Sequence, residues 1–255
     1  MLYTYESGSP AQTAVVLIHG GGLSSRMWQP VIERLPEFYC LAPDLPEHGQ
    51  SRDQAPFDLD DAARRVVEVI RLHVPDRKVH LVGLSLGGAV VLNIARLDPE
   101  VAASMMVTGT SAGISQFLGM LSLGSLWMLK FYKPEDLAQK SAKQWGIPDA
   151  YLPLFLEDIA HASSVDFNRA LIKNLMHQQL PESIASPLLV TVGEKETLPA
   201  KQAARKIAEL YPSATSRLIP KLGHVWALQD PDLFAATVKA WVNQTPLPSA
   251  LLPLK

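Results

Sequence analysis

The sequence has little cysteine and little net charge. Cys40 is the only cysteine among 255 residues, so no disulfide can form within the chain. This suits a reducing compartment, and we expect a cytoplasmic protein. Cys40 lies in the apolar run 38–43, which favours a buried, inert thiol over a nucleophile. The formal net charge is −2, so we expect neither nucleic acid nor an anionic membrane as a partner.

Long hydrophobic runs and targeting signals are missing as well. The first ten residues have no basic segment followed by an apolar stretch, so we expect no signal peptide. The longest apolar segment, residues 112–129, is interrupted by Gln116, serines and glycines. It is too polar and too short to span a bilayer comfortably. We therefore expect an amphipathic or buried helix there, and no stable membrane insertion.

What the sequence does have is a regular alternation of short β-rich runs and longer helical patterns. Most of the β-rich runs are continuously apolar, as in central strands covered on both faces. The expected strands are 2–5, 14–18, 38–42, 79–82, 104–108, 188–192 and 215–219. Between them, apolar residues recur at helical spacing over 59–70. This alternation predicts an α/β fold with a mostly parallel, doubly wound sheet.

The alternation breaks once, between residues 111 and 186. This stretch has helical patterns and no convincing strand. We expect it to be a helical insertion over the edge of the sheet where the strands end, with residues 1–110 and 187–255 forming the core. The tail 245–255 contains three prolines, which indicates an extended or loose end.

A serine lies at a cramped corner in the motif GLSLG, residues 83–87, where a predicted strand meets a predicted helix. Gly83 and Gly87 remove side chains that would clash across so sharp a turn, and Gly88 lets the helix press on the sheet. The turn would expose the Ser85 hydroxyl and aim the Leu86 N–H at a developing oxyanion. Strand, turn and helix together favour a nucleophile over an accidental match.

A serine nucleophile needs a general base, and the base needs a carboxylate that fixes its tautomer. Among seven histidines, His224 is the best candidate because it follows the last predicted strand. His19 is expected to support its loop, and His48 is interpreted first as a turn residue and second as a site residue. Glu194 and Glu196 both follow the strand 188–192, and either could be the acid. We favour Glu196, which lies farther into the loop.

The segment HGGG, residues 19–22, follows the strand 14–18. Backbone without side chains can approach a substrate carbonyl and offer a second N–H, so Gly21 is the expected donor beside Leu86, with Gly22 as an alternative. A glycine-rich loop can also cradle phosphate. The sequence has neither G-x-x-x-x-G-K-[ST] nor G-x-G-x-x-G, so nucleotide binding is poorly supported.

Taken together, these motifs resemble the α/β-hydrolase superfamily of serine hydrolases. The pieces are HGGGLSSRMW, LAPDLPEHGQS, GLSLGG, PLLVTVGEKE and GHVWALQDP, in the expected order. The resemblance implies a catalytic triad of Ser85, Glu196 and His224, oxyanion donors at Gly21 and Leu86, and a cap domain over 111–186. It implies no metal and no organic cofactor.

Two positions depart from the usual pattern. Glu47 replaces the glycine of the D-x-x-G-x-G loop, which would put a charge near the pocket mouth while the turn survives. The triad acid is Glu196 where aspartate is more common. A serine nucleophile is unlike the dehalogenases and epoxide hydrolases of this superfamily, which carry aspartate there.

The resemblance and the apolar cap predict a serine carboxylesterase for small esters with apolar groups of short to medium length. Flexible apolar linings accept varied acyl chains, although much of the apolar cap segment must pack the cap onto the core. The expected pocket residues are Gly22, Phe117, Met120, Leu121, Trp127 and Val225.

Other activities use the same triad. A thioester, an amide, a carbon–carbon bond in a dienoic ring-fission product, or a perhydrolase reaction would each need Ser, acid and His. A proline-specific aminopeptidase is less favoured, because the cap has no obvious acidic cluster for a substrate amine. A non-enzymatic ligand receptor on this fold is a further alternative.

Overall fold

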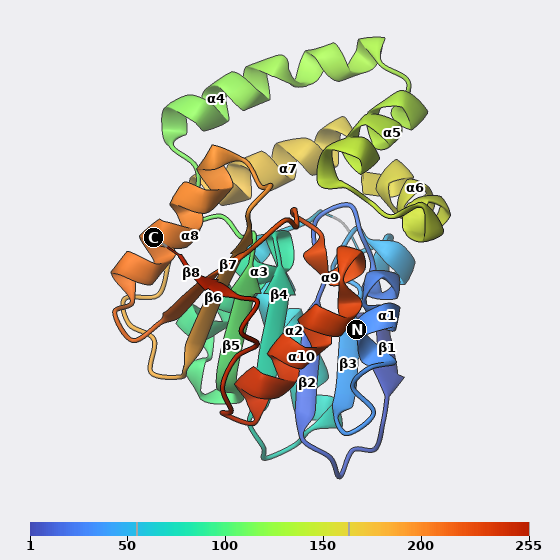
Figure 1. Cartoon of the computed structure of the whole chain (residues 1–255). Coiled ribbons are helices and arrows are strands. Elements are labelled where there is room, and N and C mark those ends of the chain that lie inside the picture. The colour runs from blue at the N-terminus through green and yellow to red at the C-terminus, as the bar shows by residue number, and fades with distance from the viewer. Residues whose placement is uncertain (55, 163, 255) are drawn as a thin grey trace.

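The computed structural model describes residues 1–54, 56–162 and 164–254, and is built around one eight-stranded sheet (Figure 1). The strand order is β1-β3-β2-β4-β5-β6-β7-β8. The strands are β1 Thr4–Ser7, β2 Ala14–Ile18, β3 Tyr39–Pro43, β4 Val79–Leu84, β5 Ala102–Thr108, β6 Leu188–Gly193, β7 Thr215–Ile219 and β8 Leu252–Pro253. The predicted α/β fold is confirmed.

The inner strands run parallel, and the two edge strands run antiparallel to their neighbours. β1 pairs with β3, and β8 pairs with β7 through Arg217 opposite Pro253 and Leu218 opposite Leu252. β2 and β6 are buried along their whole length, which agrees with their continuously apolar sequences. β8 lies in the tail that was expected to be extended or loose, and its proline is tolerated because the strand is at an edge.

Helices cover both faces of the sheet. The helices are α1 Gln29–Ile32, α2 Leu59–His73, α3 Leu86–Leu97, α4 Gln116–Ser125, α5 Pro134–Trp145, α6 Leu152–Ala162, α7 Val165–Met176, α8 Leu198–Leu210, α9 Trp226–Gln229 and α10 Pro231–Val242. Short 3₁₀ helices lie at Ser25–Trp28, Gly49–Ser51, Pro99–Val101, Leu126–Phe131 and Asp149–Tyr151. Helices α2, α3 and α8 pack into one hydrophobic cluster, and α1, α9 and α10 pack into the other.

The four helices α4–α7 connect β5 to β6 and lie above the edge where the parallel strands end (Figure 1). Within the described part of this connection there is no strand. Helix α6 is attached to the loop after β2: the Ser24 hydroxyl donates to Asp158 at 2.7 Å, and Arg26 pairs with both Glu157 and Asp158. None of the described helices is long and apolar enough to cross a membrane.

Candidate active site

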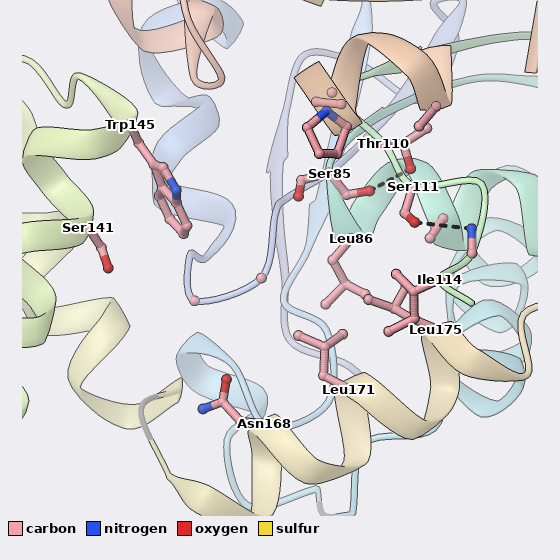
Figure 2. A pocket seen from close by; sticks show the side chains of 18 of the residues that line it. Ser85, Leu86, Thr110, Ser111, Ile114, Ser141, Trp145, Asn168, Leu171 and Leu175 are labelled. Atoms are coloured by element: carbon pink, nitrogen blue, oxygen red, sulfur yellow. Dashed lines mark hydrogen bonds between the residues drawn. The ribbon is translucent and has the colours of Figure 1, made fainter. Parts of the chain in front are cut away.

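Ser85 lies at the corner between β4 and α3, directly before the first residue of α3. Its φ is 54° and its ψ is −112°, a conformation that costs a non-glycine residue about 1–3 kcal/mol and persists only because the surrounding structure enforces it. The Ser85 N–H donates to the Thr108 carbonyl at 2.8 Å, which ties the corner to the end of β5. Ser85 lines a cavity between the sheet and the helices above it (Figure 2).

The glycines around Ser85 are required by close backbone contacts. A Cβ on Gly83 would lie 2.4 Å from the Gly87 carbonyl oxygen, and a Cβ on Gly87 would lie 2.1 Å from the Ile18 oxygen. A Cβ on Gly88 would lie 2.6 Å from Cβ of Thr110. The first turn of α3 therefore packs against the ends of β2 and β5, which brings Leu86 next to the glycine loop.

His224 and Glu196 form a pair on two neighbouring loops. His224 lies between β7 and α9, Glu196 lies between β6 and α8, and Nδ1 is 2.7 Å from Oε2. The Glu196 side chain is only 2% exposed, and its other oxygen accepts the Gly193 N–H at 3.1 Å. Glu194, the alternative acid, instead accepts the Lys221 N–H at 2.7 Å. The fold thus brings Glu196, and not Glu194, to the imidazole.

Gly109 connects the serine corner to the histidine–glutamate pair, and the sequence analysis missed it. Its φ is +56°, and a Cβ there would lie 2.9 Å from Nδ1 of His224 and 3.0 Å from each Glu196 carboxylate oxygen. Its N–H donates to the Thr191 carbonyl at 3.1 Å. The carbonyl of the preceding residue, Thr108, accepts the Ser85 N–H, so Gly109 lies between the serine corner and the His224–Glu196 pair. The signal available in the sequence was a glycine directly after the predicted strand 104–108.

Gly21 and Leu86 line the same cavity as Ser85. A Cβ on Gly21 would lie 3.6 Å from Cδ2 of Leu86, so the two segments are in contact. Leu86 is the first residue of α3, where the N–H has no acceptor within the helix and the helix dipole is positive. Gly22, the alternative donor, also lines the cavity and has φ +75°.

The cavity has a volume of about 670 Å³ and lies between the sheet and the helices above it (Figure 2). Its described lining residues are uncharged and mostly apolar. Much of its wall comes from one face of α5 and one face of α7: Leu137, Ser141, Trp145, Asn168, Leu171 and Leu175. These residues repeat at i, i+4, i+8 and at i, i+3, i+7, a signal that could have identified them.

Of the six predicted pocket residues, only Gly22 lines the cavity. Phe117, Met120, Leu121 and Trp127 are more than half exposed, and Val225 is fully buried in the core instead. For Phe117, Met120 and Leu121 the reason is the orientation of α4. Gly119 packs on α7, where a Cβ would meet Met176 at 2.2 Å, so the opposite face of α4 points to solvent.

Glu47 explains how the loop tolerates the missing glycine. Its φ is 63°, the left-handed conformation that glycine adopts without strain, so the turn survives as expected. Its carboxylate accepts the Phe57 N–H at 2.6 Å. Glu47 is not among the residues that line the cavity, so its charge is used in the loop rather than at the pocket mouth.

Cysteine chemistry and metal binding are two further possibilities for a site. Burial raises the pKa of the Cys40 thiol to about 12, so this thiol is not a nucleophile at neutral pH. Among the described residues, no group of three or more His, Cys, Asp or Glu side chains is arranged to hold a metal ion.

Comparison with known proteins bears on the family of this chain. A model of the alpha/beta hydrolase family matches residues 15–237, most of the chain. The chain belongs to the alpha/beta hydrolase family. The resemblance seen in the sequence is thereby confirmed, and the relatives of this family member include esterases.

Among curated relatives, the pimeloyl-[acyl-carrier protein] methyl ester esterase of Pectobacterium atrosepticum is 28% identical over 261 residues, covering 95% of this chain and 98% of the relative. An AB hydrolase superfamily protein of Gibberella zeae is 25% identical, covering 96% and 85%. Among solved structures, a thermophilic esterase from Thermogutta terrifontis matches with a TM-score of 0.80 at 21% identity, covering 95% of this chain and 93% of the other. An enol-lactonase from Burkholderia xenovorans has the same TM-score at 19% identity, covering 95% and 96%. At these identities the two structures establish a shared fold.

Proposed function

We propose that this alpha/beta hydrolase is a serine carboxylesterase with a Ser85–His224–Glu196 triad. The observation that carries the proposal is the buried Glu196 carboxylate 2.7 Å from Nδ1 of His224. This pair lies against Gly109, and the preceding residue, Thr108, accepts the N–H of Ser85, a strained serine that lines the cavity. The carboxylate holds a proton on Nδ1, which leaves Nε2 as the base. The esterase-type relatives support the same reaction class.

The reaction proceeds in two steps. In the first, Oγ of Ser85 attacks the ester carbonyl carbon while its proton passes to Nε2 of His224. The Gly21 and Leu86 amides bind the oxyanion, and His224 then protonates the departing alcohol to leave an acyl-serine. In the second step, water gives a proton to Nε2 of His224 and attacks the acyl carbon. The bond between this carbon and Oγ then breaks, His224 returns the proton to Oγ, and the carboxylic acid leaves.

The cavity lining supports the substrate class. A charged group buried against the uncharged described lining would lose its hydration without compensation. An uncharged acyl or alcohol group of short to medium length fits this environment. A carbon–carbon hydrolase for acidic ring-fission products is less well supported, because no described lining residue carries a positive charge to hold the substrate carboxylate.

We further propose that residues 111–186 act as the cap. Their helices α5 and α7 supply much of the cavity wall, so they would select the acyl group. The pimeloyl esterase relative suggests that a methyl ester of an acyl chain is one substrate to test. The single, buried cysteine is the reason to place the reaction in the cytoplasm.

The test is a series of p-nitrophenyl esters from acetate to palmitate, with wild type, Ser85→Ala and Ser125→Ala. Ser125 is an exposed serine on α4 and serves as the matched control. We expect butyrate to octanoate to be hydrolysed fastest and Ser85→Ala to abolish turnover. Unchanged turnover in Ser85→Ala refutes the proposed mechanism. Activity confined to a ring-fission product would favour the carbon–carbon hydrolase.

A further inference from the structure

Six large apolar side chains of α4 and of the 3₁₀ helix Leu126–Phe131 that follows it are exposed and do not line the cavity. They lie along the edge of the molecule farthest from the sheet (Figure 1). They are Phe117, Met120, Leu121, Trp127, Met128 and Phe131, each between 44% and 75% exposed. We call these six residues, together with Gly124, the outer apolar face.

The outer apolar face is large for the surface of a monomer. A whole aromatic side chain has about 150–250 Å² of surface, so six large side chains at these exposures present roughly 800 Å² to solvent. The largest apolar patch on a typical monomer covers about 300–600 Å². A stable interface buries about 800 Å² on each partner. The face therefore exposes as much apolar surface as one side of a stable dimer needs.

The charge of this face favours a second copy of the chain over a charged partner. No residue of the face is charged, and the sequence has no charged residue between Glu100 and Lys130. Amphipathic helices that bind anionic membranes carry Lys and Arg along their polar side, whereas Lys130 and Lys133 occur here only at one end. Two copies of an uncharged face can meet without burying an unpaired charge.

Gly124 lies at the centre of the face, and contacts within the chain do not explain it. A Cβ on Gly124 would find nothing within 4 Å, whereas a Cβ on Gly119 would meet Met176 at 2.2 Å. Glycine inside a helix is less favourable than alanine, so the monomer does not benefit from Gly124. A missing side chain on a helix surface lets a second helix approach closely. A fluid lipid surface has no such requirement.

The large side chains are arranged in pairs around Gly124. At seven, four and three residues on either side of it lie Phe117 and Phe131, Met120 and Met128, and Leu121 and Trp127. When two copies cross antiparallel at Gly124, each residue of one copy lies opposite its pair member in the other copy. This reciprocity is the property of an interface around a two-fold axis.

We propose that the outer apolar face is the interface of a homodimer, in which two copies cross antiparallel around a two-fold axis at Gly124. Association removes the apolar side chains from water, which is the dominant favourable contribution to most protein–protein association. In this arrangement Leu121 of one copy lies opposite Trp127 of the other. The inference does not depend on the proposed esterase activity.

Sedimentation equilibrium of the full chain tests the proposal. We expect wild type to have twice the mass of the chain at micromolar concentrations. Leu121→Glu places an unpaired charge in the interface, so the dimer dissociation constant should rise at least about 100-fold. Leu72→Glu on α2 is the matched control, because Leu72 is 56% exposed and Leu121 is 57% exposed. A monomeric wild type, or equal dissociation constants in the two variants, overturns the proposal.

Gly124→Leu distinguishes a close crossing of helices from adhesion to a lipid surface. The new side chain has room in the monomer and adds apolar area, but it blocks close approach at the crossing. We expect the dimer dissociation constant to rise at least about tenfold in a variant that keeps its circular dichroism spectrum. Wild type should not float with phosphatidylcholine vesicles. A monomeric wild type that binds these vesicles, and binds more tightly as Gly124→Leu, would show that lipid covers the face and overturn the proposal.

A double variant tests the antiparallel pairing. Trp127→Lys alone should weaken the dimer as Leu121→Glu does. Combining the two places the introduced carboxylate of one copy against the introduced ammonium of the other, while residues six positions apart are not neighbours on one helix. We expect the double variant to dimerise at least about tenfold more tightly than either single variant. A double variant that dimerises more weakly than both overturns the two-fold arrangement.

Discussion

Replacing Glu196 with glutamine tests the proposed triad at its acid. The carboxylate accepts two N–H groups, one from His224 and one from Gly193, through its two oxygens. A glutamine has one oxygen and one NH₂ group, so one of the two N–H groups loses its acceptor. If the NH₂ faces His224, Nδ1 must become an acceptor, the ring proton moves to Nε2, and the base is lost.

The expected loss follows from this change of tautomer. The corresponding carboxylate-to-amide change in a serine triad lowers kcat about 10⁴-fold when the geometry stays intact. For Glu196→Gln we expect a fall in kcat/KM of about 10³–10⁴-fold, which is roughly 4–5.5 kcal/mol of transition-state stabilisation. The assay is initial-rate hydrolysis of p-nitrophenyl butyrate, with thermal unfolding as a check on folding.

Glu194→Gln is the matched control, because this residue has the same chemistry two positions earlier and accepts a backbone N–H of Lys221 instead. We expect its kcat/KM to stay within about threefold of wild type, since it is remote from the transition state. A larger loss for Glu194→Gln than for Glu196→Gln would refute the reasoning and make Glu194 the acid.

Three further predictions concern neighbouring features. Gly109 has a φ of +56°, and Gly109→Ala places a methyl group within 3.0 Å of both His224 and Glu196. We expect kcat to fall at least tenfold, with a modest loss of thermal stability. A wild-type kcat in this variant would show that the His224–Glu196 pair can shift freely. Leu171→Ala removes part of the cavity wall, so the larger cavity should favour longer esters. Phe117 is exposed, so Phe117→Ala should not change the preferred ester chain length. Equal changes of preferred chain length in the two variants would place the pocket elsewhere. Burial lowers the pKa of His48 to about 3 in the folded protein, so the unfolded state binds more protons below about pH 6.5. The free energy of unfolding, measured with urea, should therefore fall as the pH drops from 6.5 towards 3, and more steeply in wild type than in His48→Phe. Identical slopes would mean that His48 is accessible to protons in the folded protein.

The sequence was most informative where local chemistry leaves few choices. A continuously apolar strand, a glycine-flanked serine and a following helix require a sharp corner, and Ser85 lies at this corner with a φ of 54°. The helix over 59–70 was predictable because its buried face repeats at helical spacing, and it is α2 in the structure. Motif order then predicted which loops lie at the same edge of the sheet.

The sequence could not predict the orientation of an element when neither a motif nor a single apolar face determines it. The apolar residues of α4 repeat on more than one face, and only the contact of Gly119 with α7 decides that Phe117, Met120 and Leu121 point outward. Gly109 belongs to no motif, because its need for a missing side chain arises from loops far apart in the chain. β8 contains two residues in a proline-rich tail and depends on pairing with β7.

The central claim is that Ser85 is the nucleophile, and stoichiometric labelling with diethyl p-nitrophenyl phosphate tests it most directly. Intact-mass and peptide mass spectrometry would be followed alongside residual esterase activity. We expect one diethylphosphoryl group per chain, on Ser85, appearing in step with loss of activity. Loss of activity with Ser85 unmodified, or with the label on another residue, would contradict it.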